Sequence, residues 1–188
     1  MRIIGGEARG RSFKTREGNG TRPTDSRARE ALFNMMSARV PEARFLDLYA
    51  GSGGVGLEAL SRGAQSCIFV EQNAHAAGCI KDNVRTLGFS ERAQVWTANV
   101  SSSVARLEKA GTHFDIIFID PPFLRPTEFQ WVASSLDKCA RLLHNVSGQN
   151  SGLLVVQHHW KSVLNDVAPF TLTQQRRAGE SMLTFLEI

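Results

Sequence analysis

The chain has 188 residues, of which 42% are hydrophobic and 21% are charged. A chain of this length and composition can bury its own core, so it is typical of one folded domain and not of a disordered protein. It contains no apolar run long enough to cross a membrane and begins without the apolar stretch of a secretory signal. Its three cysteines are scattered, which argues against a disulfide scaffold or a zinc site and favours a reducing cytoplasm.

The net charge of +4 is concentrated at one end of the chain. Residues 1–44 carry ten basic and five acidic residues, whereas the rest of the chain has a net charge of −1. A basic segment beside a near-neutral body is typical of proteins that bind a polyanion, although a solvated terminus has the same composition. We therefore predict a basic extension over residues 1–43 and a separate domain over residues 44–188.

The extension itself contains two predicted elements. Residues 2–14, with their glycines, predict a short hairpin, and Thr24 caps a helix predicted over residues 25–39. One face of this helix is apolar and should pack on the domain; it is formed by Ala28, Ala31, Leu32, Met35 and Met36. The arginines then left for solvent or for a ligand are Arg22, Arg27 and Arg29.

From residue 44 onward, short apolar runs alternate with helical patterns. The predicted strands are residues 44–48, 66–71, 93–98, 114–119 and 152–158. The predicted helices are residues 55–62, 74–87 (capped by Asn73), 102–109 and 128–143 (capped by Thr127). Residues 171–176 and 182–188 predict a closing hairpin. This order predicts an α/β fold with a doubly wound, Rossmann-like sheet, mostly parallel, with an antiparallel C-terminal edge hairpin.

A glycine-rich loop follows the first predicted strand of the domain. Gly51, Gly53 and Gly56 open a helix there, which is the context in which backbone amides bind a nucleotide-like ligand. Glu71 ends the next strand, at the spacing at which a carboxylate holds ribose hydroxyls. Asp47 precedes the loop and would repel a pyrophosphate by roughly 1–4 kcal/mol. We therefore predict S-adenosylmethionine, a cation without phosphates, as the cofactor in preference to a nicotinamide dinucleotide.

A second motif, Asp120-Pro121-Pro122-Phe123, ends the fourth predicted strand. Because ligands bind at the carboxyl ends of parallel strands, we expect this loop to lie next to the glycine loop. The Asp120 carboxylate and the Pro121 carbonyl would accept both hydrogens of an exocyclic amine and orient its lone pair, while Phe123 stacks on the planar group. This chemistry alone does not distinguish guanine N2, adenine N6 or a glutamine amide.

Together, these residues resemble a class I amino-methyltransferase. The sequence as a whole resembles the small-subunit ribosomal RNA methyltransferase D family over nearly the whole chain. The stretches that carry this resemblance are Arg22-Pro23-Thr24, REALFN, DLYAGSGGVGLEALSRGA and FVEQN. The resemblance implies methyl transfer from S-adenosylmethionine to N2 of one guanine in bacterial 16S rRNA, on an assembled or assembling small subunit. The alternative is an adenine-N6 methyltransferase acting on DNA or RNA, although 188 residues leave no room for a DNA recognition domain.

The predicted site has three parts. From the positions that match the family's motifs, the resemblance implies that the cofactor is bound by Asp47, Gly51, Ser52, Gly53, Gly56, Glu71, Gln72 and Asn99. The catalytic residues are Asp120, Pro121, Pro122 and Phe123, the last of which replaces a tyrosine common in the wider class. The residues expected to contact RNA are Arg2, Arg11, Arg22, Thr24, Arg27 and Arg29. We expect no metal, no membrane contact and a monomer.

Several other residues are predicted to have no functional role. His158 and His159 have no carboxylate or cysteine partner at metal-ligand spacing, so we interpret them as a surface pair at a strand end. Trp160 is predicted to be a packed side chain.

Overall fold

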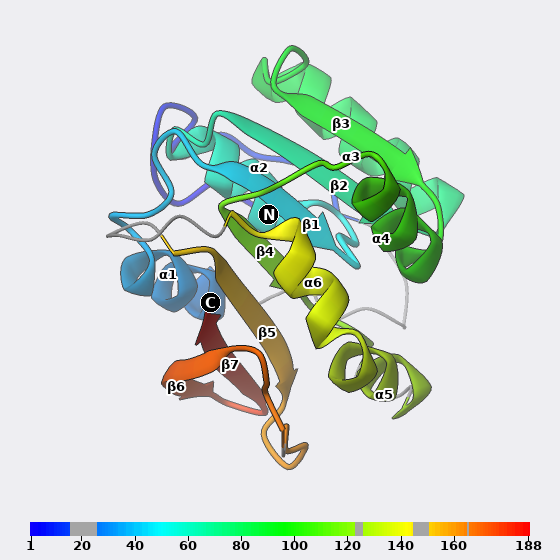
Figure 1. The fold of residues 1–188 in the computed structure, drawn as a ribbon. Helices are drawn as coiled ribbons and strands as arrows, with labels where there is room; N and C mark the ends of the chain where they lie inside the picture. Colours follow the sequence, from blue (N-terminus) through cyan, green and yellow to red (C-terminus); the bar gives the residue numbers. More distant parts are fainter. Residues whose placement is uncertain (16–25, 123–125, 145–150, 165) are drawn as a thin grey trace. The chain divides into compact units, whose positions relative to one another are not determined.

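The computed structural model describes residues 1–15, 26–122, 126–144, 151–164 and 166–188 (Figure 1). These residues form two compact units, Met1–Val100 and Ser101–Ile188. Three predicted site residues, Arg22, Thr24 and Phe123, lie outside the described residues. The predicted boundary between residues 43 and 44 stays a prediction. No helix in the described parts of the chain is both long and apolar enough to cross a bilayer.

The first unit contains a parallel sheet of three strands. Its elements are α1 (Ser26–Met35), β1 (Arg44–Leu48), α2 (Gly54–Ser61), β2 (Ser66–Glu71), α3 (Ala74–Leu87) and β3 (Ala93–Thr97). The strands are ordered β3-β2-β1, with Leu46 beside Ile68 and Ile68 beside Gln94. Because all three strands run in the same direction, the glycine loop after β1, the end of β2 and the end of β3 share one edge of this sheet.

The predicted N-terminal hairpin is confirmed. Arg2 and Ser12 form an antiparallel bridge, and the amide of Ile3 donates to the carbonyl of Arg11 at 3.0 Å. Ile3 and Phe13 are buried, so this segment belongs to the core of the first unit.

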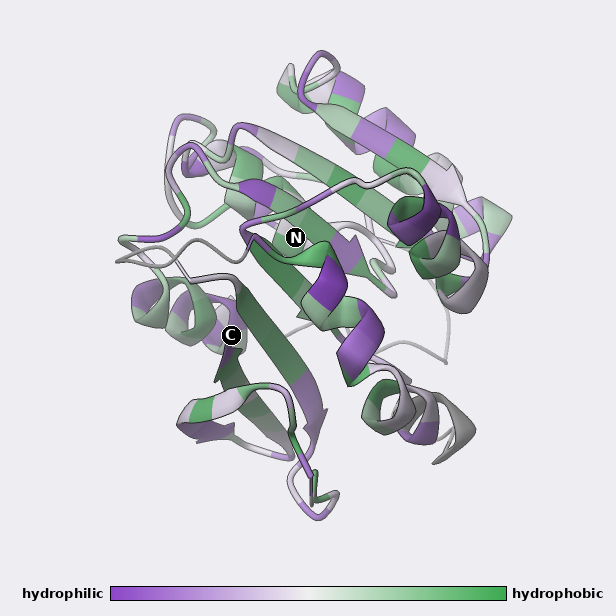
Figure 2. Ribbon diagram, in the orientation of Figure 1, coloured by the Kyte–Doolittle hydropathy of each residue, from purple (hydrophilic) through white to green (hydrophobic). Residues whose placement is uncertain are grey.

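The second unit combines a parallel strand pair with an antiparallel hairpin. Its elements are α4 (Val100–Lys109), β4 (Ile116–Ile119), α5 (Pro126–Ser134), α6 (Leu136–Leu142), β5 (Leu153–His159), β6 (Thr171–Ala178) and β7 (Ser181–Glu187). The strands are ordered β4-β5-β7-β6, with β4 and β5 parallel and both β7 pairings antiparallel. This confirms the predicted closing hairpin. Figure 2 shows β4 and most of β5 as hydrophobic, in keeping with their burial.

Local signals in the sequence explain the helix ends. The side chain of Asn73 accepts a hydrogen bond from the amide of Ala76 at 3.0 Å, and Gly88 ends α3 in the left-handed region at φ 84°.

The single helix predicted over residues 128–143 is wrong, because the chain forms α5 and α6 with a break at Ser135. Thr127 lies inside α5, which begins at Pro126, and is therefore not its cap.

His158 corrects a second prediction, since it is not a surface residue. It is 3% exposed, and its Nε2 atom lies 2.8 Å from the hydroxyl of Thr184. Burial lowers the pKa of His158 below its ordinary value of 6.5, and hydrogen bonds with the backbone oppose this shift.

Acid should therefore destabilise the second unit through His158. The unfolded chain binds a proton at this residue at higher pH than the folded chain does, so the free energy of unfolding should fall as pH drops below about 6.5 and level off below the folded pKa. Urea unfolding at pH 8, 6.5 and 5 measures this slope. The variant His158→Gln should flatten it, whereas His75→Gln, at an exposed residue, should not. Equal slopes in all three proteins would contradict the prediction.

Candidate functional site

The glycine loop has the backbone conformation that its glycines predict. Gly51 and Gly53 adopt φ angles of 57° and 81°, in the left-handed region that side chains disfavour. Gly53 is the N-cap of α2, and its amide donates to the carbonyl of Ala50 at 2.8 Å. Tyr49 also has a positive φ, 60°, which is rare outside glycine. The chain therefore makes a sharp turn between β1 and α2.

Two carboxylates bind the amides of this loop. The buried Asp47 accepts from the amide of Gly56 at 2.9 Å, and Glu71 accepts from the amide of Gly51 at 2.9 Å. The second carboxylate oxygen of Glu71 accepts from the amide of Asn73 at 2.7 Å. In a phosphate-binding loop, such amides point at the phosphate. Here the amides of Gly51 and Gly56 already donate to carboxylates. The loop therefore fits a cationic ligand better than a pyrophosphate.

The other predicted cofactor residues of this unit lie along the same sheet edge. Ser52 belongs to the loop, Gln72 follows β2 and Asn99 follows β3; Gln72 and Asn99 are exposed. Gly56 also has a packing role, because a Cβ there would lie 2.3 Å from the Phe69 ring. The cofactor-binding role of these residues stays a prediction.

The Asp120 loop belongs to the second unit. Asp120 directly follows β4 and is partly buried, Pro121 is buried and Pro122 is exposed. Ile119, the last residue of β4, is paired with Val156 of β5. Asp120 therefore lies at the carboxyl end of a buried parallel strand, where functional residues of such sheets are found. That this loop meets the glycine loop stays a prediction.

The predicted RNA contacts divide into exposed and structural arginines. Arg2 and Arg27 are exposed. Arg11 is exposed as well, but its guanidinium donates to the carbonyl of Leu87 at 3.0 Å and so binds the end of α3. The expectation that Arg29 faces solvent is wrong, because it is fully buried and lies beside the Glu58 carboxylate, with Nε and Oε2 3.5 Å apart.

Two buried polar residues that the sequence analysis did not identify hold the N-terminal segment. Glu58 of α2 accepts hydrogen bonds from the amides of Ile4 and Gly5, both at 2.8 Å. Asn83 of α3 forms two 2.8 Å hydrogen bonds with the backbone of Lys14, and its amide also donates to the carbonyl of Ser52 at 3.4 Å. The available signal was a polar residue on an apolar helix face.

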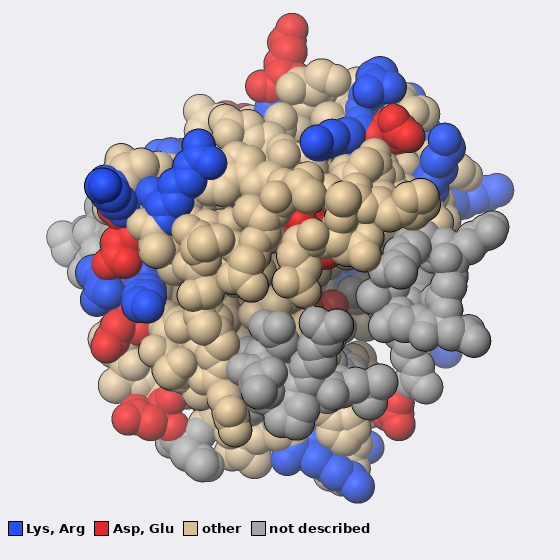
Figure 3. Space-filling model, turned by 90° about the vertical axis from the view of Figure 1, so that its right-hand side faces the viewer, with Lys and Arg blue, Asp and Glu red and all other residues tan. Residues whose placement is uncertain are grey.

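The surface features of the protein are weaker candidates for a functional site than the glycine loop and the Asp120 loop. Figure 3 shows basic and acidic side chains interspersed on the face that it presents. Trp160 is 37% exposed, and its ring packs against the guanidinium of Arg177, which lies 4.1 Å from the ring centroid. No group of three or more His, Cys, Asp or Glu residues in the described ranges could hold a metal ion.

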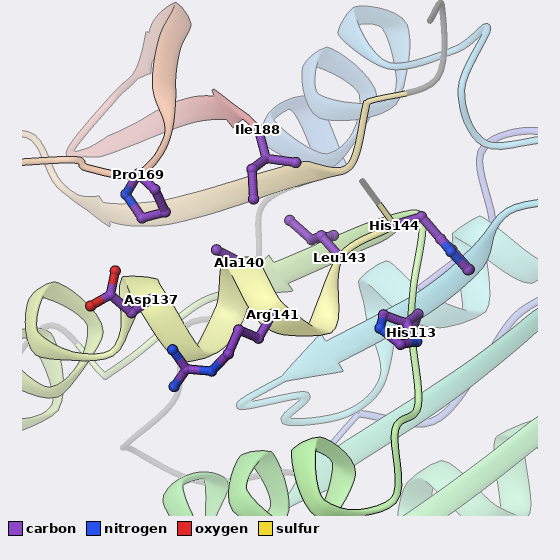
Figure 4. Close-up of a pocket in the computed structure, with 8 residues that line it drawn as sticks. All are labelled: His113, Asp137, Ala140, Arg141, Leu143, His144, Pro169 and Ile188. Carbon is purple, nitrogen blue, oxygen red and sulfur yellow. The ribbon is translucent and has the colours of Figure 1, made fainter. Parts of the chain in front are cut away.

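A pocket of about 580 Å³ lies in the second unit, lined by the stacked rings of His113 and His144 and by Leu143, Arg141 and other residues (Figure 4). His113 precedes β4, so this pocket is at the amino end of the strand. Asp120 follows the opposite end of β4, and the pocket is therefore distinct from the predicted catalytic loop.

The parallel strands, glycine loop and strand-end carboxylates define the class of Rossmann-like methyltransferases. The S-adenosylmethionine-dependent methyltransferase from Agrobacterium tumefaciens matches 89% of this chain and 63% of its own length, with a TM-score of 0.66. Its 20% identity shows a shared fold alone.

More similar proteins place the chain in a family. The family model named Conserved hypothetical protein 95 matches residues 1–187, and the chain belongs to this family. YlbH of Bacillus subtilis, named as a putative rRNA methyltransferase, is 37% identical over 95% of this chain and 94% of its own length. Ribosomal RNA small subunit methyltransferase D of Escherichia coli is 34% identical over 96% and 93%. A solved structure of a hypothetical protein from Thermus thermophilus is 33% identical, with a TM-score of 0.84 over 100% of this chain and 99% of that one.

Proposed function

We propose that the protein transfers a methyl group from S-adenosylmethionine to the exocyclic N2 of a guanine in 16S rRNA. The observation that carries this proposal is its end-to-end similarity to the Escherichia coli ribosomal RNA small subunit methyltransferase D. The adenine-N6 alternative is not favoured, because these relatives are named for ribosomal RNA. The choice of guanine N2 rests on the family resemblance of the sequence.

The residues of the first unit fit this cofactor. S-adenosylmethionine supplies an electrophilic methyl group on a sulfonium centre and carries no phosphate. Asp47 and Glu71 bring two carboxylates to the glycine loop, and these favour a cation. Glu71, at the end of β2, would hold the ribose hydroxyls, and Asn99 the adenine amine.

The Asp120 loop would position the base. The Asp120 carboxylate and the Pro121 carbonyl accept one hydrogen each from the amine, which directs the nitrogen lone pair toward the methyl carbon. On accepting the methyl group, the nitrogen would have to lose one proton, which would pass to water or to Asp120. Phe123 would stack on the base.

The substrate is a polyanion, so the basic extension is the proposed RNA-binding part. Arg2 and Arg27, which are exposed, would contact phosphates, and Arg29 would act only through its ion pair with Glu58. We further propose that the protein is a cytoplasmic monomer that acts on a small subunit or on its assembly intermediate.

The variant Glu71→Gln should bind S-adenosylmethionine about 10- to 100-fold more weakly, because hydrogen bonds to a charged group contribute about 1.5–3 kcal/mol. Isothermal titration calorimetry measures the affinity. The exposed Glu91 provides the matched control, and Glu91→Gln should bind like the unmodified protein. Unchanged affinity in Glu71→Gln would contradict the role of this carboxylate.

Methyl transfer can be tested directly with tritiated S-adenosylmethionine. The substrates are small subunits lacking the modification, naked 16S rRNA and DNA, and the labelled nucleoside is then identified. We expect label in N2-methylguanosine from the RNA substrates. Label in N6-methyladenosine, or transfer to DNA alone, would overturn the proposal.

A further inference from the structure

Gln157 is a buried polar residue in β5, where four apolar residues give way to Gln157, His158 and His159. It follows Leu153–Val156 in β5 and is 4% exposed. Within the part of the chain that the structure describes, its Oε1 atom has no hydrogen-bond partner, although the neighbouring His158 and Thr184 are paired with each other. An unsatisfied buried amide destabilises a fold, and a hydrophobic side chain of similar size would avoid this cost. The residue therefore calls for a role other than packing.

The position of Gln157 relates it to the predicted catalytic loop. Val156 is paired in parallel register with Ile119, the last residue of β4. One residue further, Gln157 continues β5 and Asp120 directly follows the end of β4, and neighbouring strands lie about 4.8 Å apart. Because side chains alternate along a strand, Gln157 leaves the sheet on the side opposite Val156, and Asp120 directly follows Ile119 at the end of the neighbouring strand. An acceptor with no partner among the described residues thus belongs to the strand next to the one that leads into the Asp120 carboxylate.

We propose that Gln157 is a specificity-determining residue that accepts a hydrogen bond from the target base. This inference rests on the proposed function and deepens it. Next to its N2 amine, guanine carries a second donor, N1–H, whereas adenine has a lone pair at N1. With the amine held by Asp120 and Pro121, Oε1 of Gln157 accepts the N1–H of guanine. The same oxygen repels N1 of adenine, so the pair of acceptors selects guanine.

The test combines activity with stability. Gln157→Met removes the acceptor and keeps the volume, and it should lower kcat/KM for 16S rRNA roughly 10- to 100-fold through a higher KM for RNA. Its thermal midpoint should stay equal or rise, because the orphaned oxygen is gone. Gln157→Glu keeps an acceptor and should restore kcat/KM to within about threefold. Gln174→Met, at an exposed glutamine of β6, is the matched control.

The outcomes separate this inference from the proposed function. Full activity in Gln157→Met, with an active parent protein, would overturn the inference and leave the proposed function intact. A drop in thermal midpoint that parallels the lost activity would identify a structural role and also overturn it. If the unmodified protein transfers no methyl group to rRNA, the proposed function itself fails.

Discussion

Replacing Asp120 by alanine should lower kcat for methyl transfer about 100- to 1000-fold, the range typical of losing one preorganised group that contacts the reacting atoms. The amine would then keep only the Pro121 carbonyl as an acceptor, and its lone pair would no longer be directed. Affinity for S-adenosylmethionine should change by less than about threefold, because the predicted cofactor residues belong to the first unit.

Single-turnover methylation of 16S rRNA and calorimetric titration of the cofactor measure the two quantities separately. Asp137→Ala removes an exposed carboxylate from α6 of the same unit and serves as the control. If Asp120→Ala retains most of the turnover, or if it loses cofactor affinity in proportion to turnover, Asp120 does not have the proposed role.

Glu58→Ala should have the largest effect on stability, about 3–5 kcal/mol, because removing one partner of a buried ion pair leaves the other charge unpaired. Arg29 is fully buried beside it, and Arg62 also donates to Glu58, at 2.8 Å. The amides of Ile4 and Gly5 lose their acceptor at the same time. Urea unfolding measures the loss.

A double variant makes this prediction sharper. Replacing a buried ion pair by hydrophobic residues is often neutral or stabilising. Arg29→Met combined with Glu58→Leu should nevertheless remain destabilised, since the amides of Ile4 and Gly5 stay unpaired. Glu91→Ala, at an exposed site, should be neutral. Full stability in the double variant would mean that the two backbone hydrogen bonds contribute little.

Elements with local signals could be predicted from the sequence. The strands Arg44–Leu48 and Ser66–Glu71 and the helix Ala74–Leu87 have their predicted bounds, because apolar runs, Asn73 and Gly88 mark them without help from distant residues. The break between α5 and α6 could not be predicted, because the apolar periodicity continues across Ser135.

The sequence was enough to predict which residues form the candidate site, but not which atoms these residues contact. Motif and spacing identified Asp47, Glu71 and the glycine loop. They did not reveal that each carboxylate binds a loop amide, which depends on how β1, β2 and α2 pack. The burial of Arg29 was missed for the same reason, because its partner Glu58 lies on another helix and an isolated arginine in a sequence resembles a solvated one.

The carboxylates on the glycine loop have a consequence for selectivity inside a cell. Adenine nucleotides and dinucleotides are plentiful there, and all of them share an adenosine with S-adenosylmethionine. At Gly51 their phosphates would encounter an oxygen of Glu71 in place of a free N–H donor. The hydrogen bonds between these carboxylates and the loop amides would therefore disfavour such competitors.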